Sequence, residues 1–123
     1  MRLNGMTAVV TGGASGMGES MVYALAKEGA SIVVVDRKVD GANAVAANVG
    51  RKGGKAICVK ADVQSTQDLV IMANKAMDTF GRINILVNNA GARVIKGFLE
   101  HTKKDWDTML SINLSGPFYC SQA

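Results

Sequence analysis

A glycine-rich turn, Thr11–Gly18, constrains the fold of this chain more than any other segment. It follows a short apolar run, Thr7–Val10, and opens a stretch with helical periodicity, Met17–Lys27. Glycines allow a tight turn and a close approach of bare backbone to a ligand, because they adopt positive φ without a steric penalty. The first N–H groups of a helix have no partner within the helix, and the helix dipole favours negative charge there. The segment therefore predicts a strand, a turn and a helix that together form a phosphate-binding site.

A second apolar run, Ser31–Val35, ends at Asp36. A dinucleotide-binding βαβ unit carries an acid about 20 residues beyond its glycines, where the carboxylate accepts hydrogen bonds from the adenosine ribose. Asp36 stands at such a distance from Gly18. We therefore expect a dinucleotide site with Asp36 at its ribose end.

The spacing of the glycines identifies the type of dinucleotide unit. The turn reads T-G-x-x-x-G-x-G, with Gly12, Gly16 and Gly18, and lacks the common G-x-G-x-x-G pattern. This spacing resembles that of the short-chain dehydrogenase/reductase family. Further motifs match the family in order along the chain: Asp62-Val63, Asn88-Asn89-Ala90-Gly91, and Asn113. The resemblance covers essentially the whole chain.

The resemblance implies roles in cofactor binding near the glycine turn and the third strand. Backbone N–H groups around Ser15, Gly16 and Met17 would hold the pyrophosphate, and the Ser15 hydroxyl would add a hydrogen bond. Asp62 and Val63 resemble the pair that contacts the adenine edge. The cofactor implied is NAD, because Asp36 would repel the extra phosphate of NADP.

Some residues that match the family motifs have two possible roles, and one has a structural role only. Asn89, Ala90 and Gly91 would line the cofactor crevice, and Asn89 is equally suited to locking the fourth strand to its neighbours. Arg37 either stacks on adenine or is solvated. Asn113 matches the catalytic-tetrad asparagine, which holds the family's proton-relay lysine through water. Without that lysine in the chain, the role of Asn113 is structural.

Apolar runs alternate with helical patterns along the whole chain, which predicts a parallel sheet with right-handed crossovers. We expect strands near 6–11, 31–36, 56–60 and 84–88, and helices near 16–28, 40–52, 66–80 and 103–123. The fold class is a Rossmann-like, doubly wound α/β sheet of about four strands. The resemblance implies the strand order 3-2-1-4, a fourth strand at the sheet edge, and a ligand crevice between strands 1 and 4. Residues 1–123 are interpreted as a single NAD-binding domain that is incomplete at its C-terminus.

Local signals predict where several helices begin and end. Gly29 and Gly53-Gly54 follow the first two helical patterns, as C-terminal glycines do. The pairs Ser65/Asp68 and Thr102/Asp105 suit helix starts. Pro117, the only proline, lies inside the last helical pattern and is expected to kink it.

Family members are about twice this long, and their catalytic Ser and Tyr-x-x-x-Lys lie in the second half, beyond Ala123. The string Tyr23–Lys27 has the same spacing but lies on the helix after the glycine turn, so we interpret Tyr23 as a packing residue and Lys27 as solvated. Tyr119 has no lysine partner.

Composition excludes several other classes of protein. The net charge of +4 is scattered and not interleaved with aromatics, which argues against nucleic-acid binding. Cys58 is expected inside a buried strand, and its distance from Cys120 suggests neither a disulfide framework nor a metal site. His101 is the only histidine and is expected in a loop before the last helix. Without a long apolar run or signal peptide, we expect a cytoplasmic protein without membrane partners.

The sequence is thus interpreted as the NAD(H)-binding half of an oxidoreductase that transfers hydride between a nicotinamide and a carbonyl or alcohol. The chain alone is expected to be inactive. One alternative is a non-catalytic nucleotide-binding or regulatory module, and another is a truncated product of a longer protein. The fourth strand and the apolar last helix are expected to make the chain a homo-oligomer.

Overall fold

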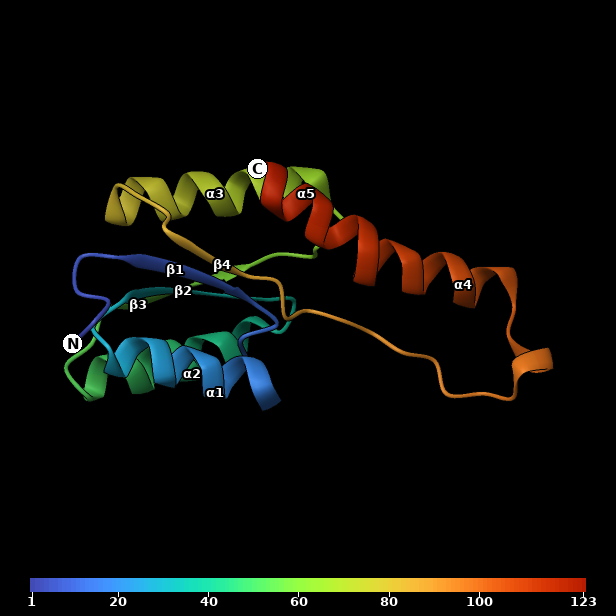
Figure 1. Ribbon diagram of the computed structural model, residues 1–123, viewed down its shortest axis with the longest axis horizontal. Helices are drawn as coiled ribbons and strands as arrows, with labels where there is room; N and C mark the ends of the chain where they lie inside the picture. Colours follow the sequence, from blue (N-terminus) through green and yellow to red (C-terminus); the bar gives the residue numbers. More distant parts are fainter.

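Four parallel strands form the centre of the protein (Figure 1). The computed structural model describes all of residues 1–123. The strands are β1 (Thr7–Thr11), β2 (Ser31–Asp36), β3 (Ala56–Lys60) and β4 (Ile85–Val87). Their order is β3-β2-β1-β4, which confirms both the expected fold class and the order implied by the family resemblance.

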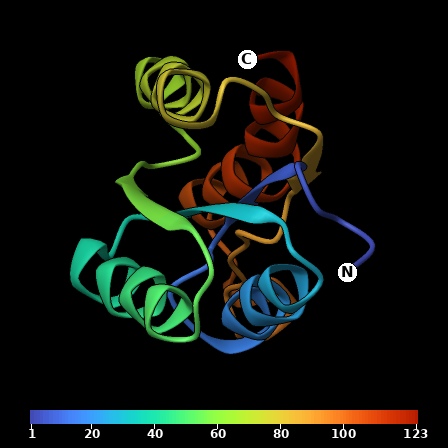
Figure 2. The same cartoon turned by 90° about the vertical axis from the view of Figure 1, so that its left-hand side faces the viewer.

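Helices cover the two faces of the sheet in separate layers, as Figure 2 shows in end view. The elements are α1 (Gly16–Lys27), α2 (Val39–Arg51), α3 (Thr66–Phe80), η1 (Phe98–Glu100), α4 (Lys103–Leu110), η2 (Ser111–Ser115) and α5 (Gly116–Gln122). Helices α1 and α2 lie on one face, and α3 and α5 lie on the other. Helix α4 extends away from the sheet (Figure 1).

The two faces of the sheet bury alternate residues of the same strands. On β1, Val9 packs in the cluster with α3, while Ala8 and Val10 pack in the cluster with α1 and α2. Both sets are almost fully buried. A strand covered on both faces needs apolar residues at every position. This is why β1 and β2 appear in the sequence as continuous apolar runs.

Strand β4 is shorter than the expected 84–88, and it lies at the sheet edge, where it pairs only with β1. Its three residues are half-buried. Asn84 lies before the strand, and its side-chain oxygen accepts a hydrogen bond from the Thr7 N–H at 2.9 Å. Asn88 lies after the strand, and its amide faces the Ser121 hydroxyl at 3.4 Å.

The expected helix ends are confirmed by backbone geometry and capping bonds. Gly29 and Gly53 follow α1 and α2 with φ of +95° and +85°. The Ser65 hydroxyl accepts from the Asp68 N–H at 3.2 Å at the start of α3. At the start of α4, Thr102 and Asp105 exchange reciprocal side-chain-to-backbone bonds of 3.1 and 3.0 Å.

The last helical pattern differs from the expected single helix with a kink at Pro117. It is divided into α4, the π-helical turn η2 and α5. The Gly116 N–H bonds to the Ser111 oxygen, five residues earlier. Pro117 lies in the first turn of α5, where a missing N–H is tolerated. The irregularity therefore precedes the proline.

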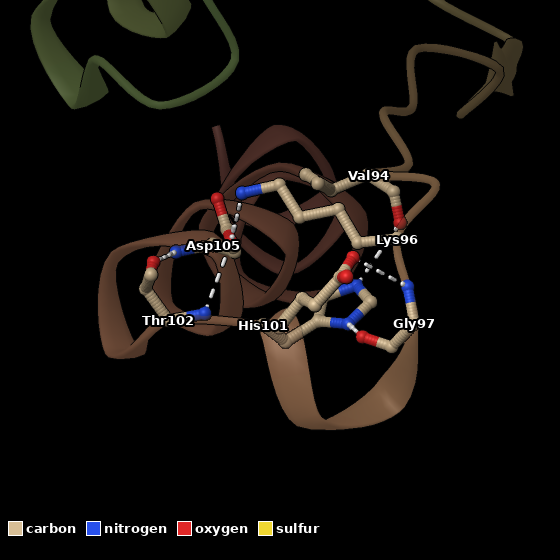
Figure 3. Close-up of polar contacts among 7 residues, drawn as sticks. Val94, Lys96, Gly97, His101, Thr102 and Asp105 are labelled. Carbon is tan, nitrogen blue, oxygen red and sulfur yellow. Dashed lines mark hydrogen bonds and ion pairs between the residues drawn. The ribbon is translucent and has the colours of Figure 1, made fainter.

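The segment before α4 extends far from the sheet but is held by its own polar contacts (Figure 3). The two ring nitrogens of His101 lie 3.1 Å from the carbonyl oxygens of Gly97 and Val94. The Lys96 ammonium lies 2.7 Å from the Asp105 carboxylate. These bonds tie the segment to the N-terminus of α4, and they confirm the expected place of His101 before the last helix.

Cys58 lies in β3 as expected, but it is half-buried, because β3 is the other edge strand. Its thiol lies 2.9 Å from the Asn43 side-chain oxygen. Cys120 on α5 is buried in the core against α3. None of the helices is both long and apolar enough to span a membrane.

Candidate functional site

A cleft of about 370 Å³ opens at the carboxyl ends of the strands. Its lining includes every predicted cofactor-binding residue except Gly16 and Gly18: Gly12, Ser15, Met17, Asp36, Arg37, Asp62, Val63, Asn89, Ala90 and Gly91. Tertiary structure thus brings together motifs that lie far apart in the chain.

The cleft also contains four residues that the sequence analysis missed: Val35, Ala61, Ala92 and Ile112. Each is the immediate neighbour of a predicted residue. Their position next to a motif residue in the sequence could have suggested them. The motif pattern alone does not indicate which of the adjacent residues face the cleft.

The glycine turn has no room for a larger residue at two of its positions, Gly12 and Gly18. Gly12 has φ of +65°, and a Cβ there would lie 2.9 Å from the Asn89 amide nitrogen. A Cβ on Gly18 would collide with the Gly12 carbonyl oxygen. Because Gly18 has no side chain, the N-terminal end of α1 packs directly on the backbone of Gly12. Gly16 has φ of +59° but open space around it, so its requirement is conformational.

The N-terminus of α1 presents unpartnered donors. Ser15 is the N-cap residue, with extended backbone and no capping bond from its side chain. The backbone N–H groups of Ser15, Gly16, Met17 and Gly18 make no hydrogen bond within the protein. Free N–H groups and the positive end of the helix dipole make this an anion-binding position.

Asp36 is held in one orientation at the end of β2. One carboxylate oxygen accepts from the Ala14 N–H at 3.1 Å, and the other accepts from the Lys38 N–H at 3.0 Å. The first bond also ties the glycine turn to β2. Each carboxylate oxygen has a further lone pair with which to accept from a hydroxyl group.

Asp62 and Arg37 face each other beside Asp36. The Arg37 Nε lies 3.7 Å from Asp62 Oδ2, and both side chains are partly exposed. Asp62 Oδ1 accepts from the Gln64 N–H at 2.9 Å. An exposed ion pair of this length contributes little stability. The guanidinium therefore remains available to a ligand at this end of the cleft.

Asn89 both lines the cleft and joins two strand ends. Its Nδ2 donates to the Gly12 carbonyl at 3.1 Å. The N–H groups of Asn89 and Ala90 each donate to the Thr11 hydroxyl at 3.1 Å. Thr11 in turn donates to the Val87 carbonyl at 3.3 Å and is 1% exposed. This buried hydroxyl connects the end of β1 to the end of β4.

Asn113 lies in the π-helical turn and bonds only to backbone. Its Oδ1 accepts from the Ala92 N–H at 2.9 Å, and its Nδ2 donates to the Ala92 carbonyl at 2.6 Å. The side chain thereby attaches the helix to the segment after β4.

Tyr23 and Lys27 lie outside the cleft. They line a different cavity, at the amino-terminal edge of the sheet. The cleft itself is lined by no tyrosine, lysine, histidine or cysteine. It is equipped to bind a phosphate-bearing ligand and carries no side chain suited to donate a proton to a carbonyl oxygen.

The chain matches the family described as short chain dehydrogenase over residues 6–123. It belongs to this family. Among curated proteins it is 42% identical to D-threitol dehydrogenase of Mycolicibacterium smegmatis, over 99% of the chain and 47% of that protein. It is 35% identical to 7alpha-hydroxysteroid dehydrogenase of Escherichia coli K12, over 99% of the chain and 48% of the relative. The chain spans about half the length of these relatives.

The short-chain dehydrogenase family uses a nicotinamide dinucleotide, NAD or NADP. The free N–H groups of α1 fit the pyrophosphate of such a cofactor. The carboxylate of Asp36 fits a ribose hydroxyl. The cleft of this short-chain dehydrogenase chain thus fits the pyrophosphate and the adenosine ribose that NAD and NADP have in common.

Proposed function

We propose that this chain is the NAD(H)-binding portion of an oxidoreductase that transfers hydride between a nicotinamide and a carbonyl or alcohol. One observation carries the proposal: a single cleft gathers the free N–H groups of α1, the Asp36 carboxylate and the Asn89–Gly91 segment. The cofactor supplies the hydride chemistry, and the protein supplies position and charge.

Different residues of the chain would bind different parts of the cofactor. The N–H groups of Ser15, Gly16 and Met17 would hold the pyrophosphate. Asp36 would accept from the adenosine ribose. Arg37, Asp62 and Val63 would contact adenine, and Asn89, Ala90 and Gly91 would line the path toward the nicotinamide.

Asp36 favours NAD over NADP. Two unit charges at 4 Å repel by about 4 kcal/mol at an effective dielectric near 20. The hollow beside Asp36 is lined by Arg37, Lys38 and Lys60, whose charges would offset part of this repulsion. It is also lined by Asp62 and Asp68, whose charges would add to it. Ser15 adds no positive charge at the turn. We expect a preference of about a hundredfold, since each 1.4 kcal/mol is a factor of ten.

Calorimetric titration with NAD and with NADP tests this proposal. The Asp36→Ala variant should narrow the difference between the two affinities. Asp40→Ala, an exposed carboxylate in the first turn of α2, serves as the control and should leave the difference unchanged. NADP binding as tight as NAD binding in the parent protein would refute the assignment of NAD.

A second candidate is a module that binds a dinucleotide without catalysis. The cleft of residues 1–123 is lined by no tyrosine, lysine or histidine, which agrees with both candidates. Under both candidates, the chain alone binds cofactor but does not turn over. The two candidates differ in whether the whole protein adds a proton donor beside the nicotinamide.

We further propose that residues 1–123 act as one cofactor-binding domain of a cytoplasmic homo-oligomer. The exposed β4 edge and the apolar residues of α4 and α5 support self-association. The named relatives act on different compounds, including D-threitol and a 7alpha-hydroxysteroid. We therefore propose only a small-molecule carbonyl or alcohol as substrate.

A further inference from the structure

A second, larger cavity lies at the opposite edge of the sheet from the dinucleotide cleft. Its volume is about 700 Å³, which is in the range of small-molecule sites. It lies between the C-terminal ends of α1 and α2, near the N-terminus of the chain in Figure 1. The dinucleotide cleft is at the other end of α1, so the two sites do not share a residue.

Three lysines line this cavity: Lys27, Lys52 and Lys55. None of them takes part in an ion pair. Glu28, an acid close in sequence, is paired with Arg2 at 3.5 Å. The cavity therefore carries several positive charges that no carboxylate of the protein neutralises.

Lysines at helix C-termini commonly satisfy the last carbonyls of the helix. Here the backbone N–H groups of the turns after α1 and α2 already bond to such carbonyls. The Leu25 carbonyl accepts from the Ala30 N–H at 3.2 Å, and the Val49 carbonyl accepts from the Gly54 N–H at 3.0 Å. Lys55 belongs to neither helix. These three exposed ammonium groups thus have no carbonyl or carboxylate partner, and only Lys52 has another contact, over the Tyr23 ring.

An aromatic wall lies beside the positive charges. The Tyr23 hydroxyl accepts a hydrogen bond from the Asn48 side-chain amide at 3.0 Å. This bond holds the ring of Tyr23, on α1, against α2. The Lys52 ammonium lies 5.1 Å from the centre of that ring. Ala26, Ala30 and Val49 add apolar surface. Because Lys52 lies over this ring, a flat apolar group would stack there as the ammonium moves from the ring to the attached anion.

We propose that this cavity binds a phosphomonoester carried on a flat ring. The dianionic phosphate suits a group of three ammonium ions better than a carboxylate, which has a single charge. The ring stacks on Tyr23. The inference is independent of the proposed function, because it uses none of the residues of the dinucleotide cleft.

Pyridoxine 5′-phosphate, a phosphate on a flat ring without a reactive aldehyde, is the probe for calorimetric titration. The parent chain should bind it, and pyridoxine without the phosphate should bind at least about tenfold more weakly, as expected for loss of charge-assisted bonds. The double variant Lys52→Gln/Lys55→Gln should lose affinity by a similar factor. Lys103→Gln/Lys104→Gln removes the same charge from α4 and should bind as the parent does.

Three results would overturn the proposal. The first is no binding of the probe by the parent chain at millimolar concentration. The second is an equal loss of affinity in the two double variants, which would mean attraction by net charge alone. The third is displacement of the probe by excess NAD, which would place it in the dinucleotide cleft. Circular dichroism of each variant confirms that the fold is retained.

Discussion

The side-chain amide of Asn89 donates a hydrogen bond to the carbonyl oxygen of Gly12, 3.1 Å away. This bond joins the segment after β4 to the glycine turn after β1. The Gly12 carbonyl also lies against Gly18, where any Cβ would collide with it. One side chain thus holds the turn that leaves the N–H groups of α1 open to a ligand.

Replacing Asn89 by alanine should lower the free energy of unfolding by about 2 kcal/mol, because it leaves a partly buried carbonyl without a partner. It should also weaken NAD binding. Urea unfolding and calorimetry measure the two effects. The adjacent Asn88→Ala removes an exposed 3.4 Å contact to Ser121, and its effect on stability should be within about 0.5 kcal/mol. Equal losses in the two variants would contradict the role given to Asn89.

Alanine substitutions at Gly18 and Gly16 should have different consequences. At Gly18 the added methyl meets the Gly12 backbone, so we expect about 3 kcal/mol of destabilisation by overpacking and loss of NAD binding. At Gly16 there is room, and the cost is that of a left-handed backbone, about 1 kcal/mol. Thermal unfolding and calorimetry of both variants test this. The prediction fails if Gly16→Ala is the more damaging change.

Acid should loosen the start of α4 through Asp105. The Lys96 ammonium and the Thr102 N–H lower the pKa of Asp105 from 3.8 to about 2. A depressed pKa means that the charged carboxylate stabilises the folded segment above pH 3.8, and that this contribution is lost as the pH falls toward 2. Trp106 is the only tryptophan, so its fluorescence reports on α4.

We therefore expect a change in Trp106 emission between pH 4 and pH 2, a window set by the two pKa values. Asp105→Asn should remove this change. Asp107→Asn, which breaks only the exposed pair with Lys103, should keep it. An unaltered acid transition in Asp105→Asn would show that the Lys96 contact does not govern this segment.

The chain should associate rather than remain a stable monomer. Strand β4 has one open edge, and Leu114 and Phe118 are 67% and 60% exposed. Light scattering over a concentration series should show a mass above 12.9 kDa, and Leu114→Ser/Phe118→Ser should lower it. Val70→Ser/Ile71→Ser on α3, with 54% and 59% exposure, is the matched control. A monomeric mass at every concentration would exclude association through these surfaces.

The chain alone should not turn over. Mixed with NADH and a panel of ketones, it should cause no loss of NADH absorbance above background, because no proton donor lines the cleft. Tyr23→Phe should behave as the parent does, since Tyr23 lies at the other edge of the sheet. Turnover that Tyr23→Phe abolishes would overturn the interpretation of Tyr23 as a packing residue.

Much of the fold could be predicted because its signals are local. The valine runs of β1 and β2, the glycines after α1 and α2, and the cap pairs Ser65/Asp68 and Thr102/Asp105 act within a few residues. The predicted helix over 103–123 was wrong in one respect. The π-helical turn before Pro117 carries Asn113, whose side chain bonds to the Ala92 backbone, and periodicity does not record such a contact.

The sequence by itself determined the alternation of strands and helices, the glycine turn and the acid at the end of β2, because each rests on backbone preferences and on burial of both sheet faces. Only the tertiary structure decided that the Asn89 amide holds Gly12, that Thr11 bonds the segment after β4, and that three lysines share a cavity with Tyr23. The physical reason is distance along the chain. Asn89 and Gly12 are 77 residues apart, and only the pairing of β1 with β4 brings them within hydrogen-bonding range.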